Sequence, residues 1–362
     1  MNLKRIIFSG GGTGGHIYPA ISIASELLLR DSNIEILFVG SKNKMEMKIV
    51  PNFGFKIFGL WISGINRNNF IKNIFLPLKL IISLFHSFII IKKFKPNIII
   101  GTGGYASGPV MYVANFLKIP TLIQEQNSYP GITNKLLSAR VNKICVAYEN
   151  LDKFFPKNKI VLTGNPVRSN ILENSKLYDD GIEFFDLDSN KKTMLVIGGS
   201  LGSREINKAI YSNKEFFKFI NLQVIWQCGK LYYDEYKQKN ISEDIKLYDY
   251  LDKIDLAYSV ADFIVSRAGA SSVSELSIVG KPVIFIPSPN VAENHQLKNS
   301  LEIVKNEGAL LVEEKNIEDL KKMISELNSS SELRNKLSKN IKKTAYTNAT
   351  NDIVDEIKKL IN

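Results

Sequence analysis

The stretch KRIIFSGGGTGGH, residues 4–16, decides the fold class of this chain. Its opening residues 4–8 are typical of a buried strand, and the glycines that follow predict a tight loop. Residues 17–29 then carry apolar side chains at helical spacing, with Pro19 in the first turn, where its missing N–H costs little. A strand, a glycine-rich loop and a helix in this order predict the first part of a doubly wound α/β sheet.

The same pattern returns in the second half of the chain. A predicted strand at residues 193–197 leads into the glycine loop 198–202 and then into a helix from about Glu205. Each half also has a second glycine turn after an apolar strand, at residues 101–104 and 267–270. Strands that alternate with helices predict two parallel sheets covered by helices, whose ligands bind at the carboxyl ends of the strands.

The length of the chain supports a division into two domains. Its 362 residues are enough for two cores, and the Asn165-Pro166 step disfavours helix at a hinge near residues 163–168. We therefore expect an N-terminal domain at residues 1–163 and a C-terminal domain at residues 164–344, facing a central cleft. A last helix, at about residues 345–362, is expected to pack back on the first domain.

Composition limits the classes of function. The formal net charge of +11 would suit nucleic acid, an anionic membrane or a phosphorylated substrate. The sequence has no helix-turn-helix, zinc-finger or RNP-like pattern, so no nucleic-acid partner is expected. Cys145 and Cys228 lie in apolar runs without metal-ligand spacing and are expected to be buried thiols of a reducing compartment. The first apolar run is too short for a signal peptide, which favours a cytoplasmic location.

The glycine loops admit two other interpretations. Gly10-x-Gly12-x-x-Gly15 has the spacing of a dinucleotide fingerprint, but residues 34–39 end in Gly40-Ser41 and not in the acid that would hold a ribose. Gly198-x-Ser200-x-Gly202 has the spacing of a hydrolase nucleophile elbow, but it opens a second half that is similar to the first. In all of these loops, glycine lets the backbone approach a phosphate, and the following helix attracts negative charge. We therefore predict a diphosphate ligand.

A series of motifs, taken together and in order, resembles the MurG family of peptidoglycan glycosyltransferases. They occupy residues 11–16, 103–109, 124–127, 164–168, 198–200, 267–275 and 295–296. The resemblance implies the GT-B fold and the inverting transfer of N-acetylglucosamine from UDP-N-acetylglucosamine to the 4-hydroxyl of lipid I, undecaprenyl-diphospho-N-acetylmuramoyl-pentapeptide. It implies no cofactor, and cell-wall synthesis and division proteins as partners. The family commonly has histidine where this chain has Gln124.

The resemblance also assigns the donor to residues from both halves. Those expected to bind UDP-N-acetylglucosamine are Thr13, Gly14, Gly15, Asn127, Arg168, Ser200, Leu251, Ala270, Ser271, Ser272, Val273, Ser274, Glu275 and Gln296. Glu275 would hold the ribose hydroxyls, although an acid at a helix start would also favour the helix dipole. Alternatives are a surface hinge charge for Arg168 and a polar helix-start residue for Gln296. No metal is expected, because the Asp-x-Asp pattern of residues 186–188 precedes a strand instead of following one.

Two residues compete for the role of general base. His16 follows a glycine loop and opens a helix, and a histidine with a pKa near neutrality suits removal of the acceptor's proton. Glu125 is the rival base. His16 has a second interpretation, in which it only binds and orients the acceptor. Two functions without lipid transfer also stay open, a UDP-sugar epimerase and a sugar-nucleotide-binding protein without catalysis.

Residues 70–91 are dominated by Ile, Leu and Phe. A spanning helix is disfavoured, since the segment contains Lys79 and a central lysine costs about 2.5–3.5 kcal/mol on insertion scales. With its neighbouring cations, the segment predicts a partly buried helix that lies on an anionic leaflet. We expect peripheral attachment to the cytoplasmic face of the bacterial inner membrane; an ordinary core helix is the alternative. His86 is expected to be a structural residue of this helix.

Overall fold

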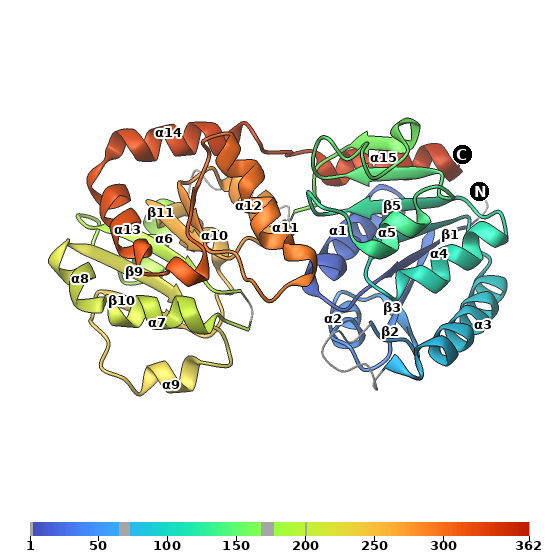
Figure 1. Cartoon of the computed structure of the whole chain (residues 1–362), viewed down its shortest axis with the longest axis horizontal. Coiled ribbons are helices and arrows are strands. Elements are labelled where there is room, and N and C mark those ends of the chain that lie inside the picture. Colours follow the sequence, from blue (N-terminus) through green and yellow to red (C-terminus); the bar gives the residue numbers. More distant parts are fainter. Residues whose placement is uncertain (1–2, 65–72, 168–176, 200, 362) are drawn as a thin grey trace. The chain divides into compact units, whose positions relative to one another are not determined.

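The computed structural model describes residues 3–64, 73–167, 177–199 and 201–361 (Figure 1). The chain divides into two compact units, one formed by Met1–Val167 with Asn348–Asn362 and the other by Arg168–Thr347. Each unit is built on a parallel sheet that carries helices. The prediction of two Rossmann-like α/β domains is confirmed.

The first unit contains, within the described residues, a seven-stranded parallel sheet in the order β3-β2-β1-β4-β5-β6-β7. Its strands are β1 (Lys4–Gly10), β2 (Ile34–Ser41), β3 (Lys56–Leu60), β4 (Ile98–Gly103), β5 (Thr121–Glu125), β6 (Lys143–Val146) and β7 (Ile160–Leu162). Its helices are α1 (Gly14–Arg30), α2 (Glu46–Asn52), α3 (Leu76–Phe94), α4 (Ser107–Phe116), α5 (Ile132–Leu137) and α15 (Ala349–Ile361). The strand order reverses between β1 and β4, where a doubly wound sheet binds its ligand.

Burial explains why the central strands are almost continuously apolar. Ile6, Ile7 and Phe8 of β1 are 0% exposed, since helices cover both faces of the sheet. One core includes apolar side chains of α1 and of α15, among them Ile353. An ion pair at 2.5 Å between Arg30 Nη1 and Asp355 Oδ1 also joins these two helices. The last helix of the chain is therefore part of the first unit.

The second unit contains, in its described part, a six-stranded parallel sheet in the order β10-β9-β8-β11-β12-β13. Its strands are β8 (Lys192–Ile197), β9 (Leu222–Gln227), β10 (Ile245–Tyr248), β11 (Phe263–Ser266), β12 (Val283–Phe285) and β13 (Leu310–Leu311). Its helices are α6 (Tyr178–Phe184), α7 (Arg204–Ser212), α8 (Lys214–Phe219), α9 (Tyr233–Lys237), α10 (Ile254–Val260), α11 (Ala270–Val279), α12 (His295–Lys305), α13 (Asp319–Ser329) and α14 (Ser331–Lys342). The strand order again reverses, between β8 and β11.

Some local expectations are corrected. Helix α1 begins at Gly14 and not at residue 17, because the apolar spacing that revealed it reports only the buried face. Pro19 therefore lies inside the helix beyond its first turn, and its predicted place was wrong. Cys145 and Cys228 are buried and unpaired with each other, as expected, and burial raises the pKa of Cys228 to about 12.

Candidate active site

The two glycine loops of the first unit leave its sheet side by side. β1 and β4 pair so that Gly10 lies opposite Gly103. Gly103 and Gly104 have φ values of +98° and +80°, and a Cβ on Gly104 would lie 2.3 Å from the carbonyl oxygen of Gly11. Only glycine permits this conformation together with such close backbone packing. The two loops therefore form one surface at the reversal point of the sheet.

The start of α1 adds an anion-binding feature to this surface. Gly14 and Gly15 are the first residues of the helix, and Thr13 precedes them. In the described structure the side chain of Thr13 makes no capping hydrogen bond, and the first turn contains no acidic residue. The first N–H groups of a helix have no partner inside it and carry its positive dipole end. Thr13, Gly14 and Gly15 thus lie where a phosphate would be stabilised.

His16 lies in the first turn of α1 and is held by the loop before it. Its Nδ1 lies 3.0 Å from the carbonyl oxygen of Gly11, and 3.2 Å from Oγ1 of Thr13. A carbonyl only accepts, so Nδ1 donates to Gly11 and Nε2 of the neutral ring keeps its lone pair. Burial lowers the pKa of His16 below its usual 6.5, and this outweighs the raising effects of Glu125, the Gly11 hydrogen bond and Glu46. The ring is therefore a neutral proton acceptor at physiological pH.

Glu125 ends β5 and is 1% exposed. Its Oε1 accepts from the backbone N of Asn127 at 3.0 Å and from its Nδ2 at 3.1 Å, and its Oε2 accepts from the N of Gly131 at 3.1 Å and Nδ2 of Asn134 at 2.8 Å. Each carboxylate oxygen thus has two donors, which use its lone pairs. This geometry orders the loop after β5, places the Glu125 carboxylate near His16, and uses the lone pairs with which a general base would contact the acceptor.

Glu46 is a further buried carboxylate, and sequence reasoning missed it. The side chain is 0% exposed at the start of α2. It accepts from the backbone N of Gly12 at 3.0 Å and from the N of Ser41 at 2.9 Å. The acid that a dinucleotide site would need at the end of β2 is absent there, whereas Glu46, a few residues later, binds the first glycine loop itself. The sequence signal that could have identified Glu46 is its position a few residues after the second predicted strand.

Buried amides support the end of β5. Gln124 is 0% exposed, and its Nε2 donates to Oδ1 of Asn165 at 2.9 Å. Asn165 Nδ2 donates back to the carbonyl of Gln126 at 2.9 Å, and Gln126 Nε2 donates to the carbonyl of Thr102 at 2.8 Å. The glutamine at the position where the family commonly has histidine therefore joins β5 to the segment after β7.

The loops of the second unit are also adjacent, and an arginine side chain connects them. β8 and β11 pair with Ile197 opposite Ser266. Arg267, which follows β11, donates through Nη2 to Oγ of Ser203 at 2.5 Å, and it forms an ion pair with Glu314. Ser203 Oγ in turn accepts from the N of Ile206 and caps α7. The hydrogen bond from Arg267 to Ser203 fixes the two loops relative to each other. Glu314 neutralises the charge of this arginine.

The start of α11 carries the small residues expected at the donor. Ala270 opens the helix, and its first turn contains no acidic side chain. Ala270 and Val273 are buried, and Ser272 and Ser274 are half-buried. Within the described structure, the buried Oγ of Ser271 has no hydrogen-bond partner. A helix start with free N–H groups and an unpartnered hydroxyl is suited to a phosphate oxygen.

Glu275 lies farther along α11 and is 9% exposed. Tyr258 OH donates to its Oε1 at 3.1 Å and so orients the carboxylate. The residue lies outside the first turn of the helix, which the structure gives as free of acids. A favourable interaction with the helix dipole falls off within one turn and therefore does not explain it.

The remaining expected donor residues have other partners or fall outside the described part. Leu251 is 4% exposed in the core, and its N–H donates to Oε1 of Gln227 at 3.2 Å. Gln296 uses its Oε1 to accept from the N of Ser288 at 2.9 Å, so its amide N–H groups are what it can offer a ligand. Asn127 is engaged with Glu125, as described above. The positions of Arg168 and Ser200 lie outside the described residues.

Helix α3 has an extensive apolar surface. Leu78, Ile81 and Phe85 of the helix are exposed, as are Ile74 and Phe75 just before it. The buried residues of the helix include two serines. The alternative of an ordinary core helix is therefore wrong. None of the helices in the described ranges is long and apolar enough to cross a bilayer.

Two smaller predictions concern His86 and the Asp-x-Asp pattern of residues 186–188. His86, which was expected to be a structural residue of this helix, is exposed on α3. In the Asp-x-Asp pattern, Asp186 pairs with Lys246 at 2.6 Å and Asp188 accepts from Asn190. Among the described residues, no three His, Cys, Asp or Glu side chains are grouped so that they could hold a metal.

Sequence comparison assigns both halves to one family. Residues 6–146 match the glycosyltransferase family 28 N-terminal domain, and residues 193–357 match the glycosyltransferase family 28 C-terminal domain. The chain belongs to glycosyltransferase family 28. A protein of Flavobacterium psychrophilum is 55% identical, over 100% of this chain and 99% of its own. One of Christiangramia forsetii is 52% identical, over 99% and 98%.

Both relatives are named UDP-N-acetylglucosamine--N-acetylmuramyl-(pentapeptide) pyrophosphoryl-undecaprenol N-acetylglucosamine transferase. The crystal structure of Acinetobacter baumannii MurG has a TM-score of 0.79 and 26% identity, and the match covers 98% of this chain and 99% of that one. A co-structure of S. aureus MnaA with UDP has a TM-score of 0.70 at 15% identity, over 98% and 96%, which shows the fold alone. The resemblance to the MurG family and the GT-B fold are confirmed.

Proposed function

We propose that this family 28 chain transfers N-acetylglucosamine from UDP-N-acetylglucosamine to the 4-hydroxyl of lipid I, with inversion, and so forms lipid II. The relatives of this name match the chain from end to end at 55% and 52% identity. The observation in the structure that carries the proposal is a half-buried, neutral histidine on the loop surface of the first unit, together with a helix start suited to an anion in the second unit.

His16 supplies the base in this proposal. Its Nε2 takes the proton of the acceptor hydroxyl as the oxygen attacks the anomeric carbon from the face opposite UDP, which inverts the configuration. Each carboxylate oxygen of Glu125 accepts two hydrogen bonds. In this proposal Glu125 stabilises the imidazolium that forms and orders the loop beside it. General base catalysis of this kind contributes about 10²- to 10⁴-fold.

The second unit holds the donor and its leaving group. The first turn of α11 and the Ser271 hydroxyl bind the diphosphate, and Glu275, oriented by Tyr258, accepts hydrogen bonds from the ribose hydroxyls. UDP departs as an anion, so its loss needs stabilisation of charge and no general acid. Preorganised N–H groups at a helix start provide this stabilisation without reorganisation during the reaction.

The apolar side of α3 supports attachment to a membrane surface. Its exposed side chains are accompanied by Lys92 and Lys93 in the last turn, and cations near such a face favour an anionic leaflet. We therefore propose peripheral attachment to the cytoplasmic face of the inner membrane, where the lipid-linked acceptor of the proposed reaction would be bound. Binding to vesicles that contain anionic lipid, against neutral vesicles, tests this part separately.

The activity is tested with purified protein, UDP-N-acetylglucosamine and a lipid I analogue with a short soluble chain. We expect release of UDP and formation of the disaccharide product without added metal. Donor alone should remain unchanged; its epimerisation would indicate the alternative enzyme class. Absence of turnover under conditions where the Flavobacterium psychrophilum relative is active would overturn the proposal, as would binding of both substrates without reaction.

A further inference from the structure

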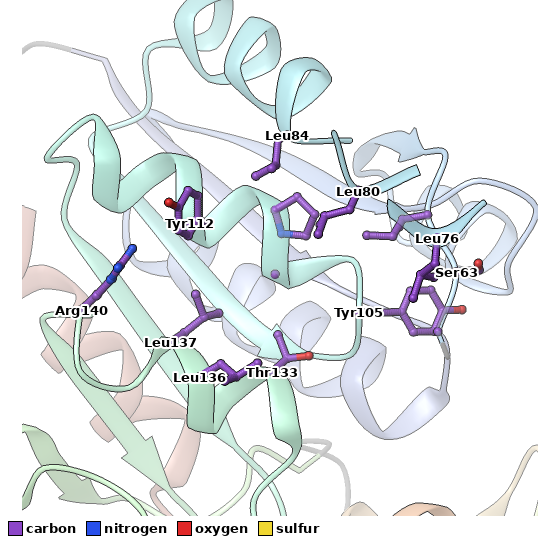
Figure 2. A pocket seen from close by; sticks show the side chains of 14 residues that line it. Ser63, Leu76, Leu80, Leu84, Tyr105, Tyr112, Thr133, Leu136, Leu137 and Arg140 are labelled. Atoms are coloured by element: carbon purple, nitrogen blue, oxygen red, sulfur yellow. The ribbon is translucent and has the colours of Figure 1, made fainter. Parts of the chain in front are cut away.

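The first unit contains an apolar cavity of about 590 Å³ next to its loop surface. Figure 2 shows Leu80 and Leu84 of α3 and Leu136 and Leu137 of α5 approaching this space from opposite sides. Tyr112 of α4 also lines it. The volume is typical of small-molecule sites, which are about 300–1,000 Å³ and mostly apolar.

Tyr105 lies between the cavity and the first glycine loop and borders both. In Figure 2 Tyr105 lies at one end of the cavity. The same ring lies against the loop, since a Cβ on Gly12 would be 3.3 Å from its Cε1. Burial and the charge of Glu46 raise the pKa of Tyr105, against a hydrogen bond with Ser41, so the phenol stays neutral. One aromatic ring thus separates the apolar space from the candidate phosphate surface.

Cations occur at the edges of the cavity. Arg140 lies at the end away from Tyr105 in Figure 2 and stacks on Tyr112, with 5.3 Å from its Cζ to the ring centroid. Lys79 donates to Oγ of the lining residue Ser63 at 3.1 Å. Among the described residues that line the cavity there is no acid. The charge of the rim therefore complements an anionic lipid.

The cavity is distinct from the outer face of α3. Leu76, Leu80 and Leu84 line it at helical spacing, whereas Ile81 and Phe85 are exposed and do not line it. The helix thus has two apolar faces. An outer face is enough for adsorption to a bilayer, so the inner one needs a different occupant.

We propose that this cavity binds the first isoprene units of the acceptor's polyprenyl chain, next to its diphosphate. This inference rests on the proposed function, in which the acceptor carries a diphosphate joined directly to a lipid chain. A diphosphate on the glycine-loop surface requires an adjoining place for that chain, and the apolar cavity lies on the other side of Tyr105, whose ring borders both. Each buried CH2 group contributes about fourfold in affinity.

A matched pair of variants on α3 separates the two faces. Leu80 lines the cavity and is 44% exposed, and its neighbour Ile81 is 65% exposed and outside it. In an assay without bilayer, Leu80→Ser should raise KM for a two-isoprene acceptor about fivefold to tenfold, with kcat and the donor KM unchanged. Leu136→Ser on the opposite wall should do the same, and Ile81→Ser should leave KM unchanged.

The chain length of the acceptor gives a second readout on the wild-type protein. With one to four isoprene units, KM should fall with each unit until the cavity is filled and then level off. In the Leu80→Ser variant, KM should fall less with each added isoprene unit. A KM independent of chain length, or equal effects of Leu80→Ser and Ile81→Ser, would overturn the proposal while turnover persists. If no acceptor of any length reacts, the proposed function itself fails.

A binding experiment distinguishes the prenyl chain from a general lipid. Geranyl diphosphate should compete with the acceptor in the wild type and about fivefold to tenfold more weakly in Leu80→Ser. A short-chain phosphatidylglycerol at the same concentration should not compete. Equal competition by both compounds would make the cavity a general lipid site and would contradict the assignment to the acceptor.

Discussion

The carboxyl edges of the two sheets have the same topology and different chemistry. In both units two glycine loops leave adjacent strands, β1 with β4 and β8 with β11, where the strand order reverses. The first edge collects a half-buried histidine, His16, and two buried carboxylates, Glu46 and Glu125. At the second, α11 opens without an acid, its carboxylate Glu275 lies farther along the helix, and the half-buried Arg267 is neutralised by Glu314.

This difference shows how one architecture can divide a transfer reaction into two tasks. A group that moves a proton must be titratable and partly desolvated, which requires compensating charges around it. A site that stabilises phosphate needs N–H groups and hydroxyls, which work at any neutral pH. Substitutions at the first edge should therefore change kcat, and those at the second should change the affinity for the donor.

The largest effect is expected from His16→Ala. Loss of the base should lower kcat by about 10²- to 10⁴-fold, while the Kd for UDP measured by calorimetry stays unchanged. His86→Ala, on the exposed side of α3, is the matched control and should be fully active. A parallel loss of UDP affinity would assign His16 to donor binding and remove the contrast between the two edges.

The next effect concerns Glu275 at the second edge. Glu275→Ala removes hydrogen bonds to a charged group and should raise the KM for UDP-N-acetylglucosamine about 10- to 100-fold, with less change in kcat. Glu302→Ala on α12 removes a surface carboxylate paired with Lys305 and should leave KM unchanged. A fall in kcat at unchanged donor KM would contradict the assigned role.

Glu46→Gln should have a smaller effect on kcat, about fivefold to tenfold, because the variant keeps one oxygen to accept from the glycine loop and loses its charge. Donor affinity should not change. Glu35→Gln, which removes a partly exposed partner of Arg5 on β2, is the control. If Glu46→Gln weakens UDP binding instead, the first loop belongs to the donor site.

The smallest effect is a displacement of the pH profile. Because the pKa of His16 lies below 6.5, the ring stays neutral to lower pH than a free histidine, and the acid limb of kcat/KM should lie below pH 6.5. Glu46 and Glu125 raise this pKa, so removing either charge should shift the limb to still lower pH. A limb above pH 6.5 in the wild type would mean that another group titrates.

Much of the fold could be predicted from short-range patterns. The strands at residues 4–8 and 193–197 and the helix from about Glu205 were found because apolar runs and glycine loops reflect local geometry and burial. The exact start of α1 was missed, since glycines carry no apolar signal. The partners of Glu125 could not be predicted either, because Asn134 reaches it from a separate helix.

The sequence by itself determined the two parallel α/β units, the glycine loops and the family, because each of these leaves a contiguous pattern in the chain. Our proposal of His16 over Glu125 as the base rests on the tertiary structure alone. That choice depends on the hydrogen-bond partners of the two side chains. Donors from the loop after β5 and from α5 use the lone pairs of Glu125. The Gly11 carbonyl accepts from Nδ1 of His16 and so keeps the ring proton on that nitrogen. Glu46 and the cavity beside Tyr105 likewise arise from elements that meet only when the sheet is assembled.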